Sequence, residues 1–263
     1  MIDSPGAVML KRWMVFGLAL TLTARASFAV GGLQPSVSRV IFPESDKEES
    51  ISLTNHAKNP VLVQAWVDDG DDRLQAAGKK ASYFLAPSVF RVDPDDAQVI
   101  RIFPTDKSAM PKDRESVAYL NVMYVDPAAK GPDGAQGAVS GGIKLSIRHR
   151  IKIFFRPKSL HAVLDRTALP LNVHLVPAGA AGAKAMLEVE NPGPFYVSLA
   201  GPLKFSSAND SADLTDGMFA PFEKRQIGLP PDSHDAGGWA KVVYRVVNDY
   251  GSVDAYEQPW TPR

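Results

Sequence analysis

The sequence contains no cysteine, carries no net charge and shows no convincing amphipathic helix. Without cysteine, disulfide scaffolds, zinc ribbons and thiol catalysis are excluded, so packing alone must hold the fold together. The 29 basic and 29 acidic residues cancel, and no overall charge favours nucleic acid as a partner. The chain also lacks an apolar run long enough for a confident transmembrane helix. What remains is a hydrophobic content of 45%, which can fill a real core.

The N-terminus has the pattern of a secretion signal. Lys11 and Arg12 precede an apolar run from Trp13 to Leu22, and small residues follow up to Ala29. A basic start, an apolar core of about ten residues and a small-x-small site are typical of a cleaved signal peptide. We therefore predict a signal peptide at residues 1–29, with an uncleaved anchor as the alternative. In a bacterium such export leads to the periplasm or beyond.

Short runs of alternating apolar and polar residues, separated by turn residues, follow the signal. In the first half the predicted strands are Val37–Phe42, Glu49–Asn55, Val61–Asp68, Tyr83–Ala86, Val89–Val92, Ala97–Phe103, Val117–Val125 and Ile143–Phe155. Such spacing is typical of an antiparallel sandwich, with a closed barrel as the alternative, and Trp66 is expected in the core.

The second half repeats this style with weaker runs. The clearest are Ala185–Val189, Phe195–Leu199, Met218–Phe222 and Lys241–Asn248. A length of 263 residues suggests two domains of ordinary size. We predict an all-β protein with domains at 30–157 and 158–263.

The stretch Gly142–Pro157, GIKLSIRHRIKIFFRP, is the longest predicted strand. Its odd positions are apolar except for His149, and the even positions before Phe154 are serine, lysine or arginine. At about 3.3 Å per residue it spans roughly 40 Å, well beyond a strand of five or six residues. Either this strand runs past its own core or another chain completes it. Its basic positions fit one solvated face of an edge strand better than a polyanion site.

Lys152 differs from the other basic residues of this stretch. It lies where the strand should be entering the core, between Ile151 and Ile153. A charge held there needs a partner such as a carboxylate.

The sequence shows no cluster of residues typical of an enzyme active site. The histidines fall in no metal-ligand spacing, and no phosphate loop, nucleophile elbow or dinucleotide fingerprint occurs. The acidic residues Asp68, Asp69, Asp71 and Asp72 lack the spacing of a full calcium loop and are predicted to be a solvated hairpin tip. A hydrolytic or glycan-binding sandwich has no recognisable pair of carboxylates. We expect no enzyme activity, no metal and no cofactor.

Eight segments of the chain share their order and spacing with one known family. They are VSRVIFPESDKEESISLTN (37–55), PVLVQAWVDD (60–69), RVDPDDAQVIRI (91–102), MPKDRESVAYLN (110–121), RIKIFFRP (150–157), NPGPFYVSL (191–199), MFAPFEKRQI (218–227) and YRVVNDYG (244–251). In these segments the chain resembles the periplasmic pilus-assembly chaperones of the chaperone–usher pathway. The resemblance implies two immunoglobulin-like β-sandwich domains arranged as a boomerang. It also implies a chaperone that binds pilus subunits by donor-strand complementation and delivers them to an outer-membrane usher.

The resemblance assigns a subunit-binding role to five residues. It implies that Ile143, Leu145 and Ile147 fill the groove of an incomplete subunit with alternating apolar side chains. It further implies that Arg39 and Lys152 anchor the C-terminal carboxylate of that subunit. Lys152 has the opposite strand parity from the three apolar donors, so the anchor and the donors are expected on different faces of the strand.

Three further charges, Glu115, Arg156 and Asp249, match a family set that bridges the two domains. We interpret them as structural residues that hold the domains together and not as a binding site for the subunit.

The expected partners are pilus subunits and an outer-membrane usher, in the periplasm, with no nucleic acid. An exposed strand edge also makes a self-capping homodimer a candidate state of the free protein. The alternative function is a secreted two-domain adhesin or structural pilus subunit. A subunit should carry a donor extension at its N-terminus, and after the predicted cleavage only a few residues precede Val37, which disfavours this alternative.

Overall fold

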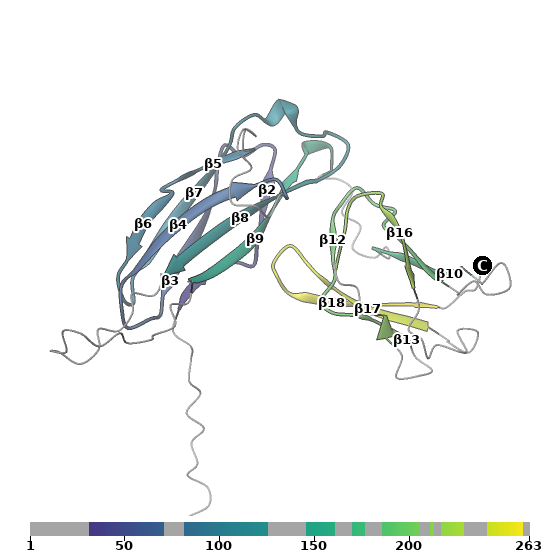
Figure 1. The fold of residues 1–263 in the computed structure, drawn as a ribbon. Helices are drawn as coiled ribbons and strands as arrows, with labels where there is room; N and C mark the ends of the chain where they lie inside the picture. Colours follow the sequence, from purple (N-terminus) through teal and green to yellow (C-terminus); the bar gives the residue numbers. More distant parts are fainter. Residues whose placement is uncertain are drawn as a thin grey trace, which may run out of the picture. The chain divides into compact units, whose positions relative to one another are not determined.

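The structure is a computed structural model that describes residues 32–70, 82–125, 146–160, 170–176, 186–205, 211–212, 217–228 and 241–259. These residues form mostly strands (Figure 1). Their buried side chains make two separate hydrophobic cores. The predicted signal peptide at 1–29 lies outside the described residues. Within the described ranges, no helix has the length and apolar character needed to cross a bilayer.

The first sandwich consists of two sheets, with the strand orders β1-β3-β7-β5 and β2-β9-β8-β4-β6. Its strands are β1 (Leu33–Pro35), β2 (Arg39–Pro43), β3 (Glu49–Asn55), β4 (Val61–Asp68), β5 (Tyr83–Ala86), β6 (Val89–Val92), β7 (Ala97–Pro104), β8 (Ser116–Val125) and β9 (Ser146–Arg156). Inward residues of both sheets, such as Phe42, Ile100 and Phe155, are fully buried in one core. The alternation in the sequence thus decides which face of each strand is inward.

One pairing in the first sandwich is parallel. β2 runs parallel to β9, with Arg39 opposite Lys152 and Pro43 opposite Arg156. All the other neighbouring strands of these two sheets are antiparallel. β9 therefore takes part in two ladders, and β2 occupies only the C-terminal part of its outer edge.

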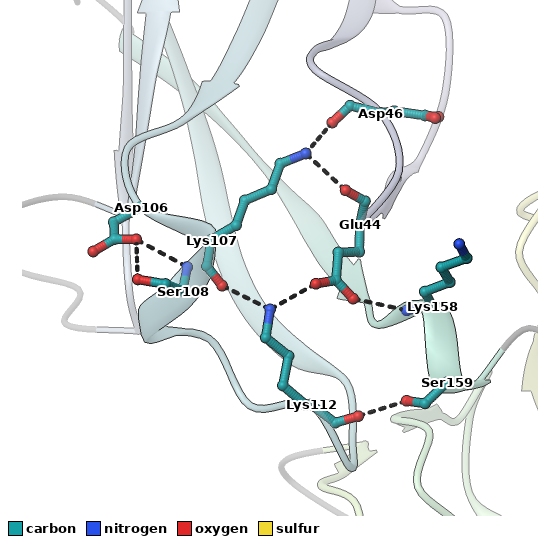
Figure 2. Close-up of polar contacts among 8 residues, drawn as sticks. All are labelled: Glu44, Asp46, Asp106, Lys107, Ser108, Lys112, Lys158 and Ser159. Carbon is teal, nitrogen blue, oxygen red and sulfur yellow. Dashed lines mark hydrogen bonds and ion pairs between the residues drawn. The ribbon is translucent and has the colours of Figure 1, made fainter.

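A group of polar contacts joins the loop after β2 to the end of β9; we call it the linker clamp (Figure 2). The Glu44 carboxylate accepts hydrogen bonds from Lys112 Nζ (2.7 Å) and from the backbone N–H of Lys158 (2.9 Å). Lys107 Nζ donates to the carbonyl oxygens of Glu44 and Asp46. The clamp thus fixes the short 3-10 helix η2 (Lys158–Leu160), which follows β9 directly.

A second short 3-10 helix, η1 (Lys107–Ala109), presents the lysine side of this clamp. Asp106 caps η1, because its Oδ1 accepts hydrogen bonds from the backbone N–H (2.9 Å) and the hydroxyl (2.6 Å) of Ser108. Ser159 Oγ in turn donates to the carbonyl oxygen of Lys112 (2.5 Å), as Figure 2 shows. These contacts give a surface loop without regular structure a defined position.

The second sandwich contains sheets with the orders β10-β11-β16, β12-β15 and β14-β13-β17-β18. Its strands are β10 (Asn172–Val176), β11 (Met186–Glu190), β12 (Val197–Ser198), β13 (Leu203–Phe205), β14 (Ser211–Ala212), β15 (Met218–Phe219), β16 (Lys224–Gly228), β17 (Lys241–Val247) and β18 (Val253–Pro259). The core contains Val189, Phe219 and Tyr244. The Tyr244 hydroxyl lies between the backbone N–H (3.3 Å) and the carbonyl oxygen (3.1 Å) of Leu171. This pair satisfies a buried polar group at the start of β10.

The structure confirms the all-β prediction and most predicted strands of the first sandwich. β3, β4, β5 and β6 have the predicted bounds, whereas β2 begins two residues later than predicted, at Arg39. The sequence missed β1, β10, β13, β14, β16 and β18. The sequence analysis missed β18 because it is the edge strand of its sheet and only Gln258 is buried. Its sequence therefore shows no apolar alternation.

Trp66 is buried, as predicted, although on a different face from the main core cluster. The neighbouring Ala65 and not Trp66 contributes to the core of the first sandwich. Strand alternation puts Trp66 on the outer face, opposite Asn121 of β8. The boundary at 157/158 and the boomerang arrangement stay predictions.

Candidate functional site

Among the described residues, β2 covers only the second half of one edge of β9. β8 pairs with β9 from Ser146 to Phe155, whereas β2 pairs with it only from Lys152 to Arg156. In the part of the chain that the structure describes, no strand covers the other edge of β9 between Ser146 and Ile151. A strand edge that no other strand covers is a template for a further strand.

Two cations lie where this open edge meets β2. Arg39 is the first residue of β2, and its register partner on β9 is Lys152. Register partners on neighbouring strands project from the same face of the sheet. The next pair, Val40 and Ile153, lies in the core, so Arg39 and Lys152 project from the outer face. The structure therefore brings together the two residues that the sequence assigns to a carboxylate anchor.

Arg39 is held by a backbone carbonyl of the second sandwich. Its Nη1 donates to the carbonyl oxygen of Val247 (2.9 Å), the last residue of β17. Its Nε is buried and has no hydrogen-bond partner among the described residues. Burial lowers the pKa of Arg39, and the negative charge of Asp249 opposes this shift. A guanidinium in such surroundings is suited to bind an anion, because a charged acceptor would satisfy a buried donor.

Lys152 is half-buried beside a hydroxyl group. Its Nζ donates to Ser198 Oγ (3.3 Å), a residue of β12, and its register partner on β8 is Tyr119. Phe154, two residues further on the same face, packs against the ring of Tyr196 with a centroid distance of 5.6 Å. Two like charges on one face disfavour each other and together favour an anion near both.

The buried residues Glu115 and Arg156 and the half-buried Asp249 form one network. Arg156 is 6% exposed and Glu115 is 3% exposed. Arg156 donates to Glu115 Oε1 (2.8 Å) and to both carboxylate oxygens of Asp249 (2.7 and 3.1 Å). Glu115 Oε2 also accepts the backbone N–H of Tyr196 (2.9 Å). Both acids thus share one arginine, and Glu115 ties the start of β8 to the segment before β12.

The network shifts the pKa of its buried members. Burial raises the pKa of Glu115, and the nearby Arg156 opposes this shift. Burial alone would lower the pKa of Arg156, but hydrogen bonds and charges from Asp249 and Glu115 raise it. The three residues predicted to bridge the domains do lie together, whereas their purely structural role stays a prediction.

Sequence reasoning missed a second polar group on the outer face of this sheet. Arg150 donates to Asp68 Oδ1 (2.9 Å), and Asn121 Nδ2 donates to Asp68 Oδ2 (2.6 Å). The guanidinium of Arg150 lies 3.9 Å from the ring centroid of Tyr119. Asp68 is therefore bound to side chains of its own sheet and is not a solvated hairpin tip. Within the described residues, no group of three or more acidic or histidine side chains could hold a metal ion.

Of the three predicted apolar donor residues, the structure describes only Ile147. Ile143 and Leu145 lie outside the described residues, while Ile147 is 41% exposed opposite Tyr124 of β8. Ile147 has the strand parity of the core residues Ile151 and Ile153. The predicted difference in parity is therefore real: Lys152 belongs to the outer face and Ile147 to the face that continues the core.

Two family models match this chain. The N-terminal domain of PapD, a pili and flagellar-assembly chaperone, matches residues 32–161, and the C-terminal domain of the pili assembly chaperone PapD matches residues 168–258. The chain belongs to the PapD family of pilus-assembly chaperones. The family resemblance inferred from the sequence is confirmed, and with it the immunoglobulin-like fold of both domains.

Relatives of this PapD-family chain are similar over nearly their whole length. The chaperone protein FimB/FhaD of Bordetella pertussis is 34% identical over 242 residues, which cover 91% of this chain and 90% of the relative. The probable fimbrial chaperone YadV of Escherichia coli is 34% identical over 233 residues, which cover 88% of this chain and 91% of the relative.

Solved structures of the PapD family share the fold. The Pseudomonas aeruginosa CupB2 chaperone has a TM-score of 0.66 and 29% identity, with 87% of this chain and all (100%) of that chain covered. The Salmonella enterica SafB chaperone, solved in complex with the SafA pilin, has a TM-score of 0.64 and 23% identity, with 87% and 96% covered. At 23% identity, the SafB structure shows only that the fold is shared.

Proposed function

We propose that this chain is a periplasmic chaperone that binds pilus subunits by donor-strand complementation and delivers them to an outer-membrane usher. The observation that carries the proposal is the open edge of β9, which ends at the paired cations Arg39 and Lys152. The family to which the chain belongs is one of pilus-assembly chaperones.

In the proposed complex, a subunit strand adds to the free edge between Ser146 and Ile151. Backbone hydrogen bonds along the edge supply affinity without regard to side chains. The subunit's terminal carboxylate lies between Arg39 and Lys152 and sets the register, because charge-assisted hydrogen bonds are roughly twice as strong as neutral ones. A fixed register matters, since a slip by one residue would turn every side chain to the wrong face.

The apolar donors supply the remaining stabilisation. Ile143, Leu145 and Ile147 share one strand parity and enter the groove of the incomplete subunit together. Each aliphatic side chain that is moved fully out of water contributes at most about 1.5–3 kcal/mol. This mechanism involves no covalent step, so the protein acts as a binding protein without a catalytic site or cofactor.

Substitution of a donor residue tests the proposal. Leu145→Asp would place a carboxylate in the apolar groove, so we expect a co-expressed pilus subunit to be lost from the periplasm while the chaperone itself accumulates normally. The matched control is Val89→Asp, which adds the same charge at an exposed aliphatic position of β6. Equal subunit levels with Leu145→Asp and with the wild type would rule out the donor role.

Alanine at the anchor tests the second half of the mechanism. Lys152→Ala and Arg39→Ala should each lower the yield of chaperone–subunit complex severely, whereas Lys58→Ala, which removes an exposed lysine far from β9 in the sequence, should not. Normal complex yield from both anchor variants would refute a carboxylate anchor.

We further propose that the free protein forms a self-capping homodimer through the same edge of β9. Two copies can cover their β9 edges by pairing with each other, as exposed strand edges tend to do. Sedimentation of the free chaperone should then show a dimer that dissociates when subunit is added.

A further inference from the structure

The turn between β17 and β18 has a rigid internal hydrogen-bond pattern. Asn248 is its organising residue, because Oδ1 accepts the backbone N–H groups of Tyr250 (3.1 Å) and Ser252 (3.0 Å). The Asn248 backbone N–H also donates to the carbonyl oxygen of Ser252 (2.8 Å), and Nδ2 donates to Asp254 Oδ2 (3.1 Å). Asparagine is favoured in such turns because its side chain can replace a backbone acceptor.

This turn makes three contacts with the ends of β2 and β9. The carbonyl oxygen of Val247 accepts Arg39 Nη1 (2.9 Å), and the Asp249 carboxylate binds Arg156 (2.7 and 3.1 Å). Gly251, with a φ of +82°, lies so close to Ser38 that a Cβ at Gly251 would be 2.6 Å from Ser38 Oγ. The turn therefore fits closely against the residue that precedes Arg39.

Arg39 should bind a carboxylate more tightly when its guanidinium is already oriented. A long flexible side chain loses rotamer freedom when it is fixed, and fixing it before the partner arrives reduces that loss on binding. The Val247 carbonyl supplies such a fixed acceptor, and its own position depends on the turn that begins at the next residue, Asn248.

We propose that Asn248 is a positioning residue for the carboxylate anchor: it holds the turn that follows Val247, whose carbonyl oxygen orients the Arg39 guanidinium. The inference rests on the proposed function, because it assumes that Arg39 and Lys152 bind a terminal carboxylate. Asn248 itself touches neither the partner strand nor the carboxylate.

The test compares two synthetic probes that differ only at their end. One is a ten-residue peptide of alternating valine and serine with a free C-terminal carboxylate, and the other is the same peptide with a C-terminal amide. The wild-type protein should bind the acid at least about tenfold more tightly than the amide, because only the acid makes charge-assisted bonds to Arg39 and Lys152. In Asn248→Ala this preference should fall to about threefold or less, with the affinity for the amide unchanged.

A rescue separates positioning from loss of structure. Asn248→Asp alone keeps the acceptor oxygen but puts it beside the Asp254 carboxylate, so the preference for the acid should fall. Combined with Asp254→Asn, the hydrogen bond is restored in the opposite direction, and the preference should return to the wild-type value. Tyr250→Ala, which removes an 80% exposed side chain from the same turn, should behave as the wild type. A variant that loses affinity for acid and amide alike would show a merely structural role and overturn the proposal.

A second measurement needs no partner. In ¹⁵N spectra of the free protein, the N–H hydrogens of the Arg39 guanidinium should exchange slowly with solvent in the wild type and in Tyr250→Ala. They should exchange quickly in Asn248→Ala. Unchanged exchange in Asn248→Ala would overturn the positioning role. A wild-type protein that binds acid and amide equally, or neither, would instead contradict the carboxylate anchor of the proposed function, and the guanidinium spectra would still decide what Asn248 does.

Discussion

At the scale of single residues, Arg156 is a cation held by carboxylates in a nearly buried position. It is almost fully buried, and two carboxylates on different sandwiches share its guanidinium. Removing one member of a buried charge network leaves the others unpaired, which costs far more than the net value of the intact pair. An exposed ion pair, by contrast, contributes little because water screens it.

Arg156→Ala should lower the free energy of unfolding by about 3–5 kcal/mol, because the Glu115 carboxylate would stay buried without its partner. Urea denaturation at neutral pH measures this change. The control is Arg91→Ala, which removes an exposed pair with Asp93 and should cost about 1 kcal/mol or less. Equal costs for the two variants would mean that the Arg156 network does not stabilise the fold.

Tyr244→Phe should cost about 1–3 kcal/mol, because the buried backbone N–H and carbonyl oxygen of Leu171 would lose their hydroxyl partner. The ring itself remains, so the packing of the second core is kept. Thermal unfolding followed by circular dichroism measures the loss, and Tyr256→Phe, on a side chain at the partly buried margin of this core, is the control. A loss no larger than that of the control would contradict the importance of the hydroxyl.

At the scale of elements, the linker clamp combines a loop, a 3-10 helix and the end of a strand. Glu44 is central to it, and hydrogen bonds from Lys112 and from the Lys158 backbone lower the pKa of its carboxyl group. A carboxyl whose folded pKa lies below its unfolded value stabilises the fold fully above the unfolded pKa. This stabilisation is lost as the pH falls through the folded pKa.

The wild type should therefore lose stability as the pH falls below the ordinary glutamate value of 4.5, and Glu44→Gln should lose less over the same range. Because Glu44 is partly exposed, the difference should be about 1 kcal/mol or less. Urea denaturation between neutral and acidic pH checks it. Parallel pH profiles for the two proteins would show that the clamp contributes no titratable stabilisation.

The elements differ in how well the sequence predicts them. β3 and β4 have the predicted bounds because each buries one face, so apolar residues alternate with polar ones. β18 was missed because its only buried residue is Gln258. A strand that lies at an edge and buries little carries almost no periodic signal.

At the scale of the whole molecule, each sandwich has its own hydrophobic core, and polar contacts between described residues join the two. Asp249 is the member of the Arg156 network that comes from the second sandwich, while Val247 contributes only its backbone carbonyl. Cooperative unfolding of both sandwiches depends on such contacts, because each core is otherwise complete in itself.

Asp249→Asn should weaken the contact between Arg156 and the second sandwich, while the side chains of both hydrophobic cores stay in place. We expect calorimetry to resolve two unfolding transitions for this variant and a single, sharper transition for the wild type. Glu257→Gln, which loses only an exposed ion pair with Lys241 in β18, should unfold as the wild type does. A single transition in Asp249→Asn would show that this carboxylate does not couple the two cores.

The candidate site was predictable in part. Arg39 and Lys152 were identified because they lie in sequence segments that resemble one family, and the structure makes them register partners. The Asp68–Arg150 pair and the contact of Arg39 with Val247 had no sequence signal. The first depends on strand register, and the second uses a backbone carbonyl that every residue possesses.

The sequence by itself determined the fold class and the faces of the strands, because alternation of apolar residues is a local property that follows from the pleat. It also identified the family and the long strand that became β9. Only the tertiary structure decided that, among the described residues, no strand covers one edge of β9 from Ser146 to Ile151, and that Arg39 contacts the Val247 carbonyl beside the turn at Asn248. These features depend on contacts between residues up to 208 positions apart, and no local pattern encodes which strand edge remains uncovered.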